Sequence, residues 1–215
     1  TRRCGIVCVK RAVSWGISEG YVSDDPLKTL KKPPVKSRKR VLSADERKAL
    51  LDAAKEPFRT FLWALFESGA RPGEVARVSA AEFDNDVWVF EKHKTAKQTG
   101  RVRVVYLTPE LAELSKKLAA EHPEGALFRN RYGLPWSRNA IRIRFRTLRR
   151  KLKLQGVVAY TARHSYCTDG LENGVPIATM AELLGHSSTR MISQHYNHIA
   201  ERKEHLKRAA MQARG

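Results

Sequence analysis

Residues 160–188 read YTARHSYCTDGLENGVPIATMAELLGHSS, and the fold that we expect is built outward from them. Their spacing predicts one helix over 161–173 and a second over 176–184. Gly185 ends the second helix, since glycine readily adopts the backbone conformation that stops a helix. Because the serines that follow provide the N-cap of another helix, His186 is expected at a corner between helices.

Most of the remaining chain also has helical periodicity. We expect further helices over 2–21, 43–54, 57–69, 109–121, 137–153, 188–196 and 199–212, and a short one that starts at Pro72. Between 80 and 107 the hydrophobic pattern repeats every two residues. Val87 and Val89 alternate with other residues before a polar loop at 92–100, and Val102, Val104 and Tyr106 do so after it. This alternation predicts an antiparallel hairpin, with a third strand near 81–84. The predicted fold class is α+β, predominantly helical, with one small antiparallel sheet.

The charge balance indicates a polyanionic partner. The 215 residues include 41 Lys and Arg and 22 Asp and Glu, which gives a net charge of +19. Such an excess is typical of proteins that bind DNA, RNA or an anionic membrane. No apolar run approaches the roughly 18 residues that span a bilayer, and no secretion leader opens the chain, so we expect no membrane insertion and a cytoplasmic location. The three sparse cysteines exclude a disulfide scaffold and a zinc finger.

The positive charge is concentrated in two segments. Residues 31–40 contain six Lys or Arg and two prolines, which predicts an extended basic tether. The predicted helix over 137–153 has no acidic residue, and Ile141, Phe145 and Leu148 form the stripe that faces the core. From these two segments we expect phosphate contacts by Lys36, Arg38, Lys39, Arg40, Arg142, Arg144, Arg146, Arg149 and Arg150.

Two sites place cationic side chains on rigid backbone. Gly69 and Pro72 force a turn between two helices, so Arg71 lies on a rigid corner. Tyr160 and Arg163 are three residues apart at a helix start and therefore face the same way.

Together with a lysine in the hairpin loop and a tyrosine ten residues after the His of the helical corner, these groups resemble the tyrosine recombinases, also called the phage integrase family. The family pattern is an Arg in a helix–turn–helix corner, a Lys in a β-hairpin, an H-x-x-R stretch, an L-G-H corner and a downstream Tyr. The corresponding residues here, in the same order, are Arg71, Lys94, Tyr160 with Arg163, His186 and Tyr196. The resemblance covers about residues 43–212.

The resemblance implies a domain organisation and partners. Residues 1–30 look like the C-terminal part of the family's helical, SAM-like DNA-clamping domain, 31–42 are the basic linker, and 43–215 form a catalytic domain with the tyrosine-recombinase fold. The partners implied are double-stranded DNA at specific sites and further copies of the chain, from dimer to tetramer, through the C-terminal helix.

The resemblance also implies a reaction. The family breaks and rejoins DNA through a 3′-phosphotyrosyl intermediate, so bond energy is conserved and no ATP, metal or other cofactor is required. Tyr196 would be the nucleophile and Lys94 the general acid for the departing 5′ oxygen. Arg71 and Arg163 would stabilise the charge of the transition state, and His186 would donate a third hydrogen bond.

Three alternatives stay open at this point. Tyr160 stands where the family usually has His, which favours a DNA-binding homologue that has lost catalysis. A metal-dependent nuclease is the second alternative, because four histidines could serve as metal ligands: His186, His195, His198 and His205. A topoisomerase of type IB would share the same site. The interval from His186 to Tyr196 is also one residue longer than the commonest form of the family.

Overall fold

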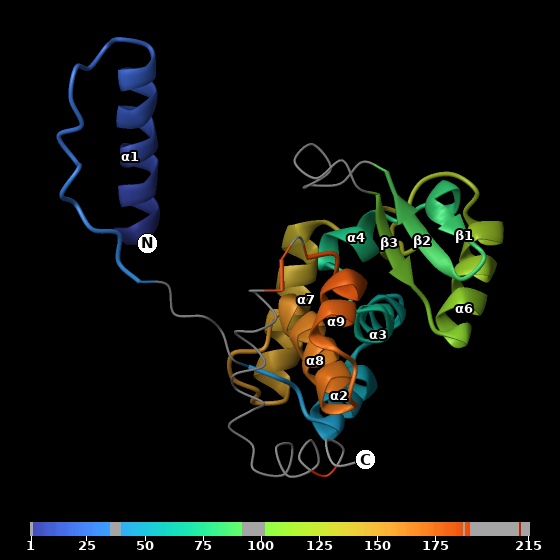
Figure 1. Ribbon diagram of the computed structural model, residues 1–215. Coiled ribbons are helices and arrows are strands. Elements are labelled where there is room, and N and C mark those ends of the chain that lie inside the picture. Colours follow the sequence, from blue (N-terminus) through green and yellow to red (C-terminus); the bar gives the residue numbers. More distant parts are fainter. Residues whose placement is uncertain (1, 35–39, 92–101, 187, 190–210, 212–215) are drawn as a thin grey trace. The chain divides into compact units, whose positions relative to one another are not determined.

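The computed structural model describes residues 2–34, 40–91, 102–186, 188–189 and 211 (Figure 1). The chain forms two compact units, residues 1–38 and 39–215. Within the described ranges, no helix is both long enough and apolar enough to cross a bilayer.

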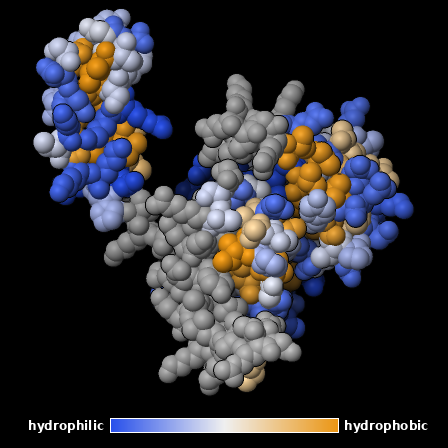
Figure 2. Space-filling model, in the orientation of Figure 1, coloured by the Kyte–Doolittle hydropathy of each residue, from blue (hydrophilic) through white to orange (hydrophobic). Residues whose placement is uncertain are grey.

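The smaller unit is built on one helix, α1 (Arg2–Ser18). Gly16 is the one residue of α1 that is buried, whereas Val9, Trp15 and Tyr21 of this unit are 52%, 60% and 76% exposed. Hydrophobic side chains accordingly appear on the surface of this unit in Figure 2. The described residues of this unit therefore form no hydrophobic core of their own.

The larger unit contains the predicted sheet and most of the predicted helices. Its elements in chain order are α2 (Ala44–Ala53), α3 (Phe58–Ser68), α4 (Pro72–Arg77), the 3₁₀ helix η1 (Ala80–Glu82), β1 (Phe83–Asp84), β2 (Val87–Phe90), β3 (Arg103–Tyr106), α6 (Pro109–Glu121), α7 (Arg138–Lys151), α8 (Ala159–Glu172) and α9 (Ile177–Leu184). The sheet has the order β1-β2-β3 with antiparallel neighbours. The helices expected over 188–196 and 199–212 fall almost wholly outside the described residues. The predicted class, α+β and predominantly helical with a small antiparallel sheet, is confirmed.

The alternating valines Val87, Val89 and Val104 lie on the less buried face of the sheet. Trp88 and Val105, which pair across β2 and β3, are buried, whereas Val102 and Tyr106 are more than half exposed. The indole removes more apolar surface from water than a valine does, and its Nε1 donates a hydrogen bond of 3.1 Å to the buried Ser115. The large aromatic side chain therefore decides which face is inside.

Helix α3 is the centre of the larger unit and contacts α2, α4, α6 and α8, and α6 lies beside the sheet (Figure 1). Phe61 is fully buried, and Phe58 packs edge-on against the rings of Trp136 and Phe145, at 5.1 and 5.8 Å between centroids. Phe145 belongs to the predicted apolar stripe of α7, which is buried as expected.

Helices α8 and α9 enclose a second, smaller core of Cys167, Leu171, Met180, Ala181 and Leu184. They approach closely at Gly170, where an added Cβ would lie 2.0 Å from Cε of Met180. This packing fixes the end of α9 relative to α8, which carries Arg163.

Candidate active site

The corner between α3 and α4 holds Arg71. Gly69 ends α3 in the left-handed conformation (φ 57°), and Pro72 opens α4 with Arg71 as its N-cap. The carboxylate of Glu74 accepts hydrogen bonds from the Arg71 backbone N–H, at 2.9 Å, and from Nη1 of its guanidinium, at 2.7 Å. Glu74 therefore holds both the backbone and the side chain of Arg71, which confirms the predicted rigid corner.

Arg163 joins three elements from a buried position. It lies on α8 and is only 2% exposed. Its Nη1 donates to the carbonyl oxygen of Gly69 at 3.1 Å, and its Nη2 donates to that of Leu184. The guanidinium therefore ties α8 both to the Arg71 corner and to the end of α9.

The end of α9 presents three successive carbonyl oxygens, each of which accepts a hydrogen bond from a different arginine. Leu183 accepts from Arg103 Nη1 at 2.8 Å, Leu184 from Arg163, and Gly185 from Arg71 Nη2 at 3.2 Å. We call these oxygens the carbonyl row. Because the C-terminus of a helix carries partial negative charge, the carbonyl row reduces the repulsion between three guanidinium groups held close together.

The ionisation of the cluster favours anion binding. Burial and the neighbouring charge of Arg71 lower the pKa of Arg163 to about 10, so this guanidinium stays protonated at neutral pH. Burial alone would raise the pKa of Glu74, but the charges of Arg103 and Arg71 and the hydrogen bonds from Arg71 lower it overall. Three positive charges against one carboxylate leave the cluster net positive, as a phosphate diester requires.

Tyr160 lies beside this cluster at the start of α8. Burial lowers the pKa of Arg71, but Glu74 and then the phenol of Tyr160 raise it above its ordinary value. Tyr160 is 41% exposed, and its ring contacts that of His164 at 5.4 Å between centroids. The structure therefore brings Tyr160 next to Arg71 as well as next to Arg163.

His186 follows α9 at a fixed backbone position. Gly185 has a φ of 61°, its N–H donates to the Glu182 oxygen at 2.8 Å, and the His186 N–H donates to the Ala181 oxygen at 2.9 Å. This pair of bonds is a Schellman cap, so the predicted glycine stop is confirmed. The cap fixes the direction in which the half-buried His186 leaves the helix.

Five of the other predicted site residues lie outside the described residues, and the rest lie on the larger unit. Lys94 and Tyr196 lie outside the described residues, as do Lys36, Arg38 and Lys39. Arg40 forms an ion pair with Glu46 and donates to the Gln155 oxygen at 3.3 Å, so its charge is engaged within the larger unit. On α7, the side chains of Arg142, Arg144, Arg146 and Arg150 are exposed, and that of Arg149 is half-buried.

Sequence reasoning missed Arg103. This residue is 3% exposed and opens β3, two positions before the buried Val105. Arg103 shares its strand face with Val105, but no local pattern marks that face as the buried one.

We predict that Gly69→Ala lowers the stability of the larger unit. An added Cβ would lie 2.4 Å from the ring of Tyr166, and the φ of 57° strains any residue other than glycine. The left-handed backbone should cost about 1–2 kcal/mol, and displacing Tyr166 a further ~1–3 kcal/mol. Unfolding in urea measures the loss. Gly73→Ala is the matched control, since nothing lies within 4 Å of its Cβ position, and an equal loss there would contradict the prediction.

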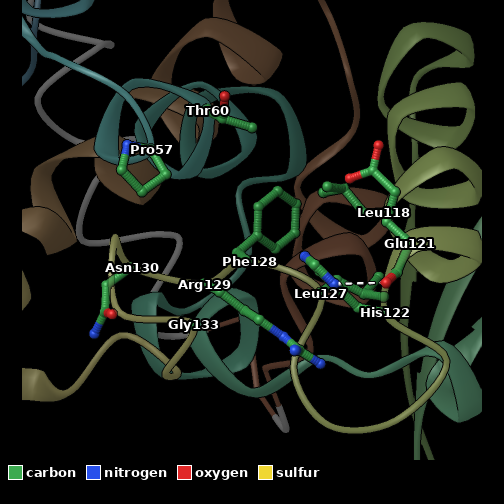
Figure 3. Close-up of a pocket in the computed structure, with 10 residues that line it drawn as sticks. All are labelled: Pro57, Thr60, Leu118, Glu121, His122, Leu127, Phe128, Arg129, Asn130 and Gly133. Atoms are coloured by element: carbon green, nitrogen blue, oxygen red, sulfur yellow. Dashed lines mark hydrogen bonds between the residues drawn. The ribbon is translucent and has the colours of Figure 1, made fainter.

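A cavity of about 330 Å³ lies elsewhere on the larger unit, between α3, α6 and the loop that follows α6 (Figure 3). Leu118, Leu127 and Phe128 give it apolar walls, and His122 and Arg129 are among its polar residues. No candidate catalytic residue within the described ranges lines it, so it is separate from the arginine cluster.

Comparison with known proteins gives one family by sequence and a matching fold among solved structures. The model of the phage integrase family matches residues 40–203. Tyrosine recombinase XerD of Staphylococcus aureus (strain Mu50) is 29% identical over 201 residues, which cover 87% of this chain and 68% of the relative. Among solved structures, XerA recombinase has a TM-score of 0.62 at 21% identity, over 100% of this chain and 77% of its own. A lambda integrase dimer bound to a COC′ core site has a TM-score of 0.70 at 19% identity, over 88% of this chain and 70% of its own.

Proposed function

This chain belongs to the phage integrase family, and on that premise we propose that it is a site-specific DNA recombinase that breaks and rejoins strands through a 3′-phosphotyrosyl intermediate. The observation that carries the proposal is the carbonyl row, which holds Arg71 and Arg163 in a net positive cluster at the end of α9. Pre-organised donors of this kind stabilise the charge of a phosphoryl transition state.

The proposed reaction exchanges one phosphodiester for another. The phenol of Tyr196 loses its proton to solvent water as its oxygen bonds to phosphorus. The bond from phosphorus to the 5′ oxygen breaks, and Lys94 gives the departing oxygen a proton that it later regains from solvent. Arg71 and Arg163 hold the non-bridging oxygens, and His186 donates a further hydrogen bond to the phosphate. Because the phosphotyrosine retains the bond energy, a second strand can reverse the step without ATP or metal.

Tyr160 takes part differently from the usual histidine. Its phenol lies beside Arg71, which supports a role as a hydrogen-bonding neighbour of the phosphate. Its hydroxyl group can donate a hydrogen bond to a phosphate oxygen, whereas the ring nitrogen of a histidine could also act as a base. We therefore assign Tyr160 to binding and not to proton transfer.

The proposed partners are double-stranded DNA at specific sites and other copies of the chain. The likeness to a lambda integrase dimer bound to its core site supports both. We propose that the exposed arginines of α7 contact phosphates and that residues 199–212 mediate self-association on DNA. Residues 1–30 would be the end of a DNA-clamping domain, and the basic segment 31–42 its linker.

We predict a steep salt dependence of DNA affinity. If the linker and α7 together contact ~6–10 phosphates, affinity should fall by roughly 10³–10⁵-fold between 50 and 200 mM salt. Fluorescence anisotropy with a labelled duplex measures it. Arg142→Gln should reduce the slope of log affinity against log salt by about 1. Lys117→Gln, on α6 and 3.9 Å from Glu121, is the control and should leave the slope unchanged; a flat salt dependence of the wild type would contradict the phosphate contacts.

Covalent trapping tests the function itself. The chain is incubated with nicked duplexes of candidate or randomised sequence, in EDTA and without ATP, and products are separated under denaturing conditions. A protease-sensitive protein–DNA adduct at a 3′ phosphate is the expected result. Binding without an adduct would indicate a homologue that has lost catalysis, and EDTA-sensitive cleavage with free ends would indicate a nuclease. Relaxation of supercoils without strand exchange between two duplexes would indicate a topoisomerase.

A further inference from the structure

Arg103 is a buried cation that the reaction described above does not use. Its guanidinium Nη1 donates to the carbonyl oxygens of Val104, at 2.7 Å, and Leu183, at 2.8 Å. Its Nε lies 3.8 Å from Oε2 of Glu74. Within the part of the chain that the structure describes, Nε and Nη2 have no hydrogen-bond partner. Burying a charge this deeply is costly, so its position requires an explanation beyond filling space.

The first connection of Arg103 runs through Glu74. One carboxylate oxygen of Glu74 bonds to the guanidinium of Arg71, and the other bonds to the Arg71 backbone and faces Arg103. Glu74 is 6% exposed, so these two arginines supply the positive charge that offsets its burial. Arg103 therefore helps to fix the orientation of the carboxylate that orients Arg71.

The second connection runs through the end of α9. Gly185 packs directly on the Arg103 side chain, since an added Cβ would lie 2.7 Å from its Cδ and 2.9 Å from its Nε. The bond from Arg103 to the Leu183 oxygen holds the preceding turn. Arg103 thus sets the position of the Gly185 oxygen, which accepts from Arg71, and of the next residue, His186.

We propose that Arg103 is a positioning residue for strand cleavage, which holds Glu74 and the end of α9 and through them orients Arg71 and His186 toward the phosphate. The proposal rests on the proposed function. An apolar side chain of similar length would fill the space but would hold neither the Leu183 oxygen nor Glu74. A lysine would keep the positive charge, but it lacks the planar guanidinium group that reaches both the Leu183 oxygen and Glu74.

The test compares Arg103→Met and Arg103→Lys with Val105→Ala, a buried control on the same strand and face. The measurements are the single-turnover rate of adduct formation at saturating nicked DNA, the DNA dissociation constant, and the urea midpoint. Arg103→Met should lower the rate by about 10–100-fold, because small misplacements of catalytic groups have effects of this size. Arg103→Lys should recover part of the rate, and both should bind DNA within about twofold of wild type, since Arg103 is buried. Val105→Ala should lose stability but keep its rate, and an equal rate loss there would overturn the proposal.

A double variant separates positioning from general damage. In the Arg71→Lys background, Arg103→Met should reduce the rate by a smaller factor than in the wild-type background, because one of the two groups that Arg103 orients is already disabled. If the two losses multiply, Arg103 acts independently of Arg71 and the proposal fails. Should Arg103→Met not fold, Arg103→Lys carries the same comparison.

A spectroscopic readout separates this proposal from the proposed function. The side-chain Nε–H signal of Arg71 should shift in both Arg103 variants and stay in place in Val105→Ala. If wild type forms no adduct, the proposed function fails, and an unshifted Arg71 signal would still overturn the positioning role. If wild type forms the adduct and Arg103→Met matches its rate, only the positioning role fails.

Discussion

Tyr196→Phe should abolish the covalent adduct and leave DNA affinity within about twofold of wild type. The substitution removes one hydroxyl group, which is the nucleophile of the proposed reaction, and leaves the ring. Loss of the atom that forms the covalent bond should reduce strand cleavage by at least about 10⁴-fold. Denaturing gels of nicked-duplex reactions measure the adduct, and anisotropy at fixed salt measures the affinity.

The neighbouring histidine provides the control for that variant. His195→Ala changes the adjacent side chain and should retain the adduct, because an imidazole cannot form a phosphotyrosine. Both residues lie outside the described residues, so the assignment rests on the family pattern. A full-strength adduct in Tyr196→Phe would show that another residue is the nucleophile.

Arg163→Lys should lower the cleavage rate at saturating DNA by about 10²–10³-fold, which corresponds to a loss of about 3–4 kcal/mol of transition-state stabilisation. One ammonium group cannot donate to the Gly69 and Leu184 oxygens and also to a phosphate, as the guanidinium fork can. A buried carbonyl left without its donor should also destabilise the fold by about 1–3 kcal/mol. Single-turnover cleavage and urea unfolding measure the two effects separately.

Arg144→Gln is the matched control, since Arg144 is an exposed arginine of α7. It should weaken DNA binding and leave the rate at saturating DNA unchanged. A wild-type rate in Arg163→Lys would mean that this position needs only a positive charge, and the bidentate role would have to be withdrawn.

Many of the helix boundaries could be predicted because they depend on the residues at the helix ends themselves. The range expected for α6, 109–121, agrees with the structure because Pro109 opens the helix after the N-cap Thr108. The stops at Gly69 and Gly185 were also predictable, since both residues adopt the left-handed conformation that favours glycine.

The buried face of the sheet and the role of Arg103 could not be predicted in this way. Valine occurs on both faces of the hairpin, so the choice depends on how Trp88 packs against residues of other elements. The contacts of Arg103 come from Leu183 and Glu74, which are distant in sequence and belong to two different helices. Partners of a buried charge are a property of the tertiary structure and leave no local pattern.

The sequence predicted which residues make up the candidate site, but not the contacts that hold them in place. Arg71, Arg163, Tyr160 and His186 were expected from the family pattern, and the structure describes all four around the end of α9. That the carbonyl row holds the arginines was not foreseeable, because main-chain acceptors have no signature in a sequence. The roles of Lys94 and Tyr196 stay predictions.

The use of main-chain oxygens has a consequence for how far related sequences can diverge. Every amino acid has a carbonyl group, so conservative apolar replacements at Leu183 and Leu184 preserve the acceptors as long as the helix keeps its course. Glycine is required at Gly69 and Gly185, where the backbone is left-handed and an added Cβ would also lie within 3 Å of a neighbouring side chain. An arrangement of this kind depends on the path of the chain, and it suits a fold that the solved structures share with this chain at 19–21% identity.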